Sequence, residues 1–180
     1  MSRIPIPATL EVAPEASKPT LEAIKKQIGA LPNVFRMMSN SPAVLEAYAA
    51  LNGALGKGKL DKKIRERIAL AIAQINGCEY CLAAHTLLAK SLGFTDQQIL
   101  DLRRANFPAD PKLDALVKLA KSITENKGHA DPQSVDNFFA AGYSKGALID
   151  VVIAVADKII TNYVFALTAV PIDYPLAPAL

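Results

Sequence analysis

Helix-start signals recur along nearly the whole chain, and they constrain its fold more than any other feature. Ser41-Pro42, Asp110-Pro111 and Asp131-Pro132 each place a good N-cap residue before a proline at the first helical position. Thr95–Gln98 is a capping-box pattern that begins two residues after Gly93, a residue typical of helix C-caps. Alternating β-branched runs bounded by tight hairpin turns are missing. The sequence therefore predicts an all-α fold.

The pattern predicts about eight helices in a single domain that spans residues 1–180. They are expected near residues 19–29, 41–55, 61–76, 78–92, 95–104, 111–126, 131–141 and 144–169. The proline-rich tails, 1–16 and 171–180, are expected to be extended. A faint internal repeat aligns the segment from Lys62 with the segment from Lys145. If the repeat is real, the second copy is a degenerate helix pair that kept only the scaffold, with Thr161 in the place of Cys78.

Composition and charge argue against two classes of partner. Lys and Arg number 20 against 17 Asp and Glu, a net charge of +3, and this excess is too small to predict binding to nucleic acid or to an anionic membrane. The most apolar stretch contains Asp150, Asp157 and Lys158, and an ionised group at mid-bilayer costs about 2.5–3.5 kcal/mol. Prolines interrupt the N-terminal segment, so it does not resemble a signal peptide. We therefore expect a soluble, cytoplasmic protein.

The only two cysteines lie in the stretch NGCEYCLAAH, together with one of the two histidines. Cys78, Cys81 and His85 fall on one face of the predicted helix 78–92 because their spacings are three and four residues. Gly77 separates this helix from the preceding one and places Cys78 at a helix N-terminus. Free amide groups and the helix dipole favour a thiolate at such a position.

Several kinds of site could use this cluster. Haem attachment requires histidine directly after the second cysteine, and Leu82 stands there. A structural zinc site needs four ligands; the cluster supplies three, and His129, the other histidine, lies in a distant loop. We therefore expect no metal and no cofactor. The remaining interpretations are an inert pair of buried thiols and a redox dithiol that closes a small disulfide, with His85 exchanging a proton. The redox dithiol is favoured.

Glu66 is a further candidate because it precedes a helix that is apolar on all sides. Everything from Ile68 to Ala73 is apolar, and a helix that is hydrophobic all round is buried. Glu66 lies one turn before Leu70 on a stripe that runs into this buried part. Two interpretations are open: a surface carboxylate paired with Arg65, Arg67 or Lys62, or a partly buried base that orients His85 or relays its protons.

These residues together resemble a known family. Glu66, Cys78, Cys81 and His85, with their spacing, are similar to the motif of the alkyl hydroperoxidase D-like group in the carboxymuconolactone decarboxylase superfamily. The resemblance is clearest from about residue 41 to residue 92. Looser similarity to the branch of peroxidase-related proteins extends to Leu31–Phe35, Ala141–Ser144, Asn162 and Val170–Asp173.

The resemblance implies a helical alkyl hydroperoxidase D-like fold, a homo-oligomer (trimer or hexamer) and a peroxiredoxin-type dithiol peroxidase without haem, flavin or metal. The expected substrate is a hydroperoxide, and the expected partner is an external dithiol reductant. In such enzymes the second cysteine attacks the peroxide, which assigns attack to Cys81 and resolution to Cys78. His85 and Glu66 would relay protons. Cys81 also lies one helical turn from His85, whereas Cys78 lies nearly two turns away.

The sequence departs from the best-studied members at Tyr80, where they carry a second histidine. A phenol can donate a hydrogen bond but titrates near pH 10, so we expect Tyr80 to support the site rather than to act as its base. This departure bears on peroxidase turnover more than on dithiol chemistry. The lactone decarboxylases of the superfamily do not depend on a CxxC pair, so its presence argues against that chemistry. The alternative function is a non-catalytic redox sensor or a structural oligomer.

Overall fold

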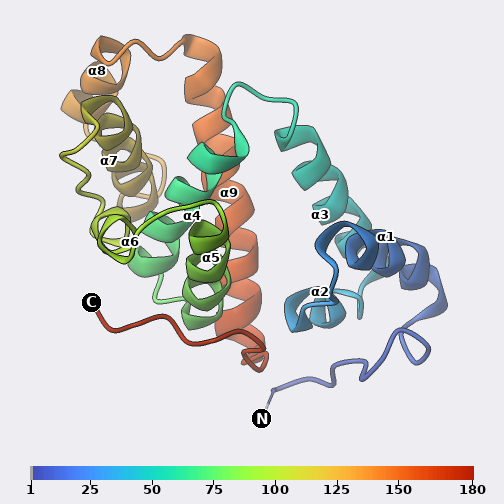
Figure 1. Cartoon of the computed structure of the whole chain (residues 1–180). Coiled ribbons are helices and arrows are strands. Elements are labelled where there is room, and N and C mark those ends of the chain that lie inside the picture. The colour runs from blue at the N-terminus through green and yellow to red at the C-terminus, as the bar shows by residue number, and fades with distance from the viewer. Residues whose placement is uncertain (1) are drawn as a thin grey trace.

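The computed structural model describes residues 2–180, and all regular structure within them is helical. A 3-10 turn at Glu15–Ser17 precedes nine α-helices in this part of the chain (Figure 1). They are α1 (Lys18–Ile28), α2 (Asn33–Met38), α3 (Pro42–Leu55), α4 (Lys62–Ile75), α5 (Glu79–Ser91), α6 (Asp96–Arg103), α7 (Pro111–Glu125), α8 (Pro132–Ala140) and α9 (Lys145–Thr168). The all-α prediction is confirmed.

One helix was not predicted, and the faint repeat does not correspond to a second helix pair. The short helix α2 was not expected; it follows Pro32, which provides no side-chain cap, so the usual start signal is missing. The segment that the faint repeat aligns with α4 and α5 forms the single helix α9, without a break. It is therefore one long helix and not a second helix pair.

Helix α4 lies at the centre of the fold and contacts α5, α6, α7 and α9 (Figure 1). Its residues from Ile68 to Ala73 have no exposed surface, because a helix with apolar side chains on every face must be surrounded by other elements. Gly77 adopts a φ of 61°, a left-handed conformation that glycine accepts without steric cost. This turn separates α4 from α5 and lets α5 pack against α4.

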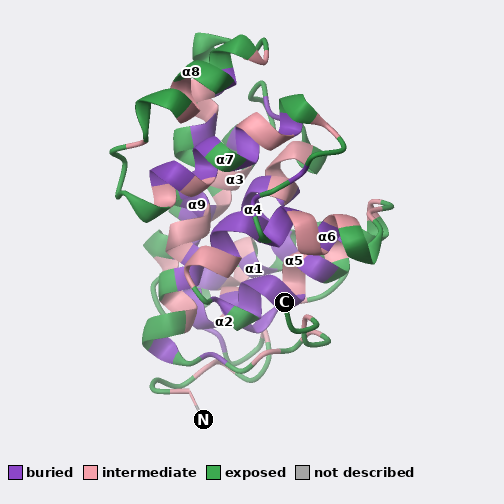
Figure 2. Cartoon of the chain, turned by 90° about the vertical axis from the view of Figure 1, so that its left-hand side faces the viewer, coloured by how far each residue is buried: buried purple, intermediate pink, exposed green. Residues whose placement is uncertain are grey.

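The buried residues form two hydrophobic clusters, which appear as the purple interior in Figure 2. One cluster joins α4, α6, α7, α8 and the first part of α9. The other joins α1, α2 and α3 to the start of α5 and to the C-terminal tail. Cys78 and Cys81 belong to the second cluster, so the N-terminal helices and the tail cover the sulfur atoms.

The C-terminal tail is extended, as predicted, and it packs against its own chain. The Asp173 carboxylate accepts hydrogen bonds from the Tyr80 hydroxyl at 2.7 Å and from the Asn33 backbone N–H at 2.8 Å. The buried Arg103 side chain donates to the Pro178 carbonyl at 2.7 Å. These contacts hold the tail against the helix that begins at the cysteine pair.

Helix α9 is long and apolar enough to cross a membrane by length and composition alone. In this fold it packs against α3, α4 and α7, and it carries a buried ion pair between Asp157 and Lys158. Buried charges inside the helix fit a core element of a globular fold.

Replacing Asp173 with alanine is expected to lower the free energy of unfolding by about 1–3 kcal/mol, because the buried Tyr80 hydroxyl loses its acceptor. Urea denaturation measures this loss. Asp136→Ala is the matched control, since Asp136 is exposed on α8, and it should change the free energy by about 0.5 kcal/mol or less. Equal stability of the two variants would show that the tail is not anchored through Asp173.

Candidate functional site

The two cysteines lie at the start of α5 and are joined by a disulfide bond. Cys78 is the N-cap residue, and its sulfur accepts the backbone N–H of Cys81 at 3.2 Å. This confirms the predicted position of Cys78 at a helix N-terminus. Cys78 is 1% exposed and Cys81 is 3% exposed. In its disulfide form the pair is therefore closed to bulk solvent.

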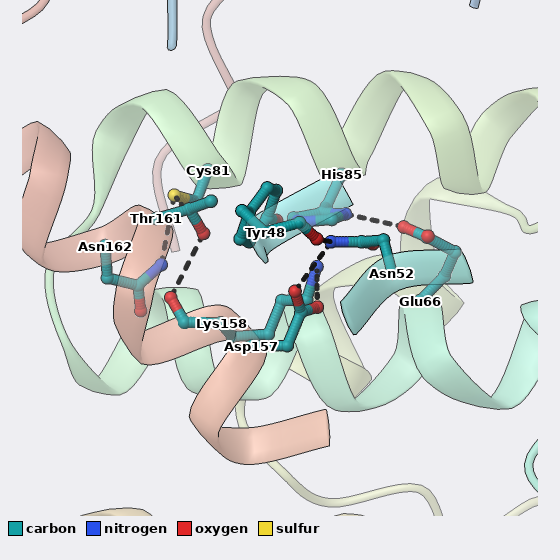
Figure 3. Close-up of polar contacts among 9 residues, drawn as sticks. All are labelled: Tyr48, Asn52, Glu66, Cys81, His85, Asp157, Lys158, Thr161 and Asn162. Atoms are coloured by element: carbon teal, nitrogen blue, oxygen red, sulfur yellow. Dashed lines mark hydrogen bonds and ion pairs between the residues drawn. The ribbon is translucent and has the colours of Figure 1, made fainter. Parts of the chain in front are cut away.

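Glu66 and His85 meet between α4 and α5, as Figure 3 shows. The Glu66 Oε2 atom lies 2.6 Å from Nδ1 of His85. Glu66 is buried, with 8% of its surface exposed, and within residues 2–180 its ion-pair partner is His85 and not Arg65. The surface interpretation of Glu66 is wrong, and its position between the buried part of α4 and the face of α5 explains why.

Electrostatics keep Glu66 ionised in this buried position. Burial by itself raises the pKa of a carboxyl group. The facing charge of His85, the hydrogen bond from His85 and the charges of Lys158 and Lys62 outweigh burial, so the pKa of Glu66 is lowered. A carboxylate can only accept a hydrogen bond, so Nδ1 of His85 carries the proton. In the neutral imidazole, Nε2 is then free to act as a base.

Helix α9 supplies a polar partner to Cys81. Asn162 is buried, and its Nδ2 group donates to Sγ of Cys81 at 3.0 Å. Asn76 fixes the orientation of this amide by donating to Oδ1 of Asn162 at 2.8 Å. The Thr161 hydroxyl lies 4.0 Å from the same sulfur (Figure 3). A hydrogen-bond donor aimed at sulfur favours the thiolate when the disulfide is reduced.

Tyr80 points away from the Glu66–His85 pair. Its hydroxyl accepts the Val34 backbone N–H at 3.1 Å and donates to Asp173. Burial raises the pKa of this phenol well above its ordinary value. Tyr80 therefore connects the cysteine helix to α2 and to the tail and does not stand where a second base would act.

Among the predicted site residues, the structure brings Glu66 to His85 and bonds Cys78 to Cys81. Cys81 and His85, four residues apart, lie one turn from each other on the same face of α5. In the part of the chain that is described, residues 2–180, no three His, Cys, Asp or Glu side chains gather as a metal site would require. Asn162 was noticed in the sequence, but its contact with sulfur was not predicted.

Part of the chain matches a known family. Residues 42–122 match the carboxymuconolactone decarboxylase family. An uncharacterized protein of Haemophilus influenzae is 43% identical over 63 residues, which cover 34% of this chain and 50% of the relative. This chain therefore matches about half the length of that relative.

Solved structures share the fold over nearly the whole chain. An uncharacterized peroxidase-related protein of Ralstonia eutropha with an alkylhydroperoxidase AhpD core has a TM-score of 0.83 and 20% identity, covering 96% of this chain and 92% of that one. The debrominase Bmp8, solved in complex with 2,3,4-tribromopyrrole, has a TM-score of 0.81 and 18% identity, covering 96% and 94%. Residues 42–122 thus resemble the carboxymuconolactone decarboxylase family, and the chain has the fold of the alkylhydroperoxidase AhpD-like proteins.

Proposed function

We propose that this protein is a thiol-dependent hydroperoxide reductase that uses the Cys78–Cys81 pair and a Glu66–His85 proton relay. The observation that carries the proposal is the buried 2.6 Å contact between Glu66 and His85, one helical turn from Cys81. A buried carboxylate that fixes the tautomer of a histidine beside a redox-active cysteine pair is an arrangement suited to proton transfer. The shared fold supports the proposal but does not choose the oxidant, because a debrominase has the same fold.

The proposed reaction begins with the reduced pair. His85 takes the proton of the Cys81 thiol at Nε2, and the thiolate attacks one peroxide oxygen of the hydroperoxide. The O–O bond breaks, a sulfenic acid forms on Cys81, and the departing alkoxide receives the proton from His85. The Cys78 thiol then attacks the Cys81 sulfur, which forms the disulfide and releases water.

An external dithiol completes the proposed cycle. It supplies two electrons and two protons, becomes a disulfide itself and returns both cysteines to thiols. Of the two cysteines, Cys81 is the better leaving group because His85 can return a proton to it. We therefore propose a hydroperoxide as the oxidant, a cellular dithiol as the reductant and the cytoplasm as the compartment.

The alternative is a redox sensor or a structural oligomer without turnover. The burial of both sulfur atoms favours the structural oligomer, because catalytic and redox-sensor cysteines are usually accessible. Turnover separates the two functions. A catalyst consumes many equivalents of hydroperoxide when dithiol is added, whereas a sensor is oxidised once.

The first prediction of this proposal concerns the two cysteines. Cys78→Ser is expected to trap a sulfenic acid on Cys81 after one equivalent of cumene hydroperoxide, because the resolving thiol is missing. Cys81→Ser should abolish hydroperoxide consumption. Mass spectrometry after labelling with a sulfenic-acid probe locates the modified residue. A sulfenic acid on Cys78 in the Cys81→Ser variant would reverse the assignment.

Glu66→Gln is expected to slow alkylation of Cys81 near neutral pH, to move its pH profile upwards and to cut peroxidase activity at least tenfold. Glutamine keeps the hydrogen bond to His85 but removes the negative charge that stabilises the imidazolium, and general acid–base groups contribute about 10²–10⁴ in rate. Iodoacetamide alkylation at several pH values measures the effect. Glu46→Gln, on the exposed side of α3, is the control. Parent-like reactivity of Glu66→Gln would remove the relay from the mechanism.

We also propose that the protein is a homo-oligomer, a trimer or a hexamer. Helix α9 exposes an apolar stripe with spacings that keep its members on one side of the helix. The stripe consists of Ile149, Val152, Ile153, Tyr163 and Leu167. Leu167 alone is 70% exposed. A contiguous apolar face of this length is typical of a surface that another subunit covers.

Light scattering is expected to give three or six times the 19.2 kDa mass of one chain at micromolar concentration. The double variant Val152→Glu/Leu167→Glu places two charges on the stripe and should shift the protein to the monomer. Val12→Glu changes an exposed apolar residue outside α9 and should leave the assembly intact. A monomeric parent protein would contradict this proposal.

A further inference from the structure

A second buried polar cluster lies beside the relay, and the proposed reaction does not use it. Asp157 and Lys158 on α9 form an ion pair with 2.8 Å between Oδ2 and Nζ, and their side chains are only 4% and 13% exposed. Asn52 on α3 donates to the other Asp157 oxygen at 3.0 Å. A buried ion pair gains little net stability because both charges lose hydration. Stability therefore does not by itself explain an ammonium group at this position.

The spacing along α9 places Lys158 close to the relay. Thr161 and Asn162, which contact the Cys81 sulfur, follow Lys158 by three and four residues and lie on the same face of the helix. Lys158 is thus one turn from the sulfur contact, as His85 is on α5. Figure 3 shows the Asp157–Lys158 pair between the Cys81 contact at one end and the Glu66–His85 pair at the other.

Titratable and charged groups near Lys158 come from several helices. Helix α3 contributes Tyr48, α4 contributes Glu66 and the more distant Lys62, α5 contributes His85 and the cysteine pair, and α9 contributes Asp157. Lys158 is paired directly with Asp157, and the charge of Glu66 acts on it from a greater distance. Burial lowers the pKa of a lysine, but Tyr48, Asp157 and Glu66 outweigh it and raise the pKa of Lys158. The ammonium group is therefore charged near neutral pH.

We propose that Lys158 is a positioning residue of the dithiol site, whose buried ammonium group, held by Asp157, keeps Glu66 ionised so that Glu66 fixes the Nδ1 proton of His85. Nε2 of His85 is then free to act as a base, one helical turn from Cys81. This inference deepens the proposed function and rests on it for the identity of the relay. It predicts that Lys158 acts through Glu66 and not directly on the sulfur.

The test measures the rate of Cys81 alkylation by iodoacetamide in the reduced full-length protein from pH 5 to 9, with the modified residue identified by mass spectrometry. Lys158→Met keeps the length of the side chain and removes its charge. The acid limb of the profile should move up by about one pH unit, because a carboxyl group that loses an opposite charge protonates at higher pH. Lys158→Arg should restore the parent profile. Lys63→Met, on the exposed side of α4, should not move it.

A double-mutant cycle shows whether the effect passes through Glu66. In the Glu66→Gln background, Lys158→Met should produce no further shift, since the carboxylate on which it acts is already gone. An equal shift in both backgrounds, or no shift in the parent background, would overturn the inference. If Lys158→Met does not fold, Asp157→Asn/Lys158→Met removes both charges and leaves no unpaired buried ion, and a smaller shift in the same direction is expected because the negative charge of Asp157 is lost as well.

This experiment uses no hydroperoxide, so it separates the inference from the proposed function. If the profile shifts as expected but the parent protein shows no peroxidase turnover, the hydroperoxide reductase function fails while the role of Lys158 stands. If turnover is present and the profile does not shift, the role of Lys158 fails while the proposed function stands.

Discussion

The buried hydrogen bond between Glu66 and His85 is the interaction on which the site depends. It joins α4, the central helix, to α5, which carries the cysteine pair, and it holds a charge inside the protein. A buried carboxylate is costly unless it is paired, so the surrounding helices must supply compensating groups. The His85 ring and the Lys158 ammonium do so from α5 and α9. The site is therefore a product of three helices and not of the CxxC segment alone.

Helix α9 links this chemistry to the packing of the chain. One face carries Asn162, which donates to the Cys81 sulfur, and Lys158, which faces the relay. Another face carries the apolar stripe proposed to bind a second subunit. Because both faces belong to one rigid helix, assembly through the stripe would also brace the polar residues against the cysteine pair. The C-terminal tail, tied to Tyr80 by Asp173, closes the same region from the other side.

Much of the fold could be predicted from local signals, because capping residues and prolines mark where the helices begin. Helix α2 was not predicted because Pro32 precedes it without a capping side chain. The spacing of Cys78, Cys81 and His85 placed them on one face, but it could not decide whether Glu66 is buried, which depends on how α4 packs. Asn162 was harder to identify because its partners, Cys81 and Asn76, are distant in sequence. Lys158 is paired with the adjacent Asp157, but its place beside the relay depends on how α9 packs.

A single-turnover experiment tests the central claim most directly. Fully reduced protein is mixed with less than one equivalent of cumene hydroperoxide, and the alcohol product, the free thiols and the Cys78–Cys81 disulfide are quantified together. The account predicts one alcohol and one intramolecular disulfide, with the loss of two thiols, for each hydroperoxide consumed. Unchanged thiols in the presence of unreacted hydroperoxide would contradict it, and so would hydroperoxide loss without formation of this disulfide.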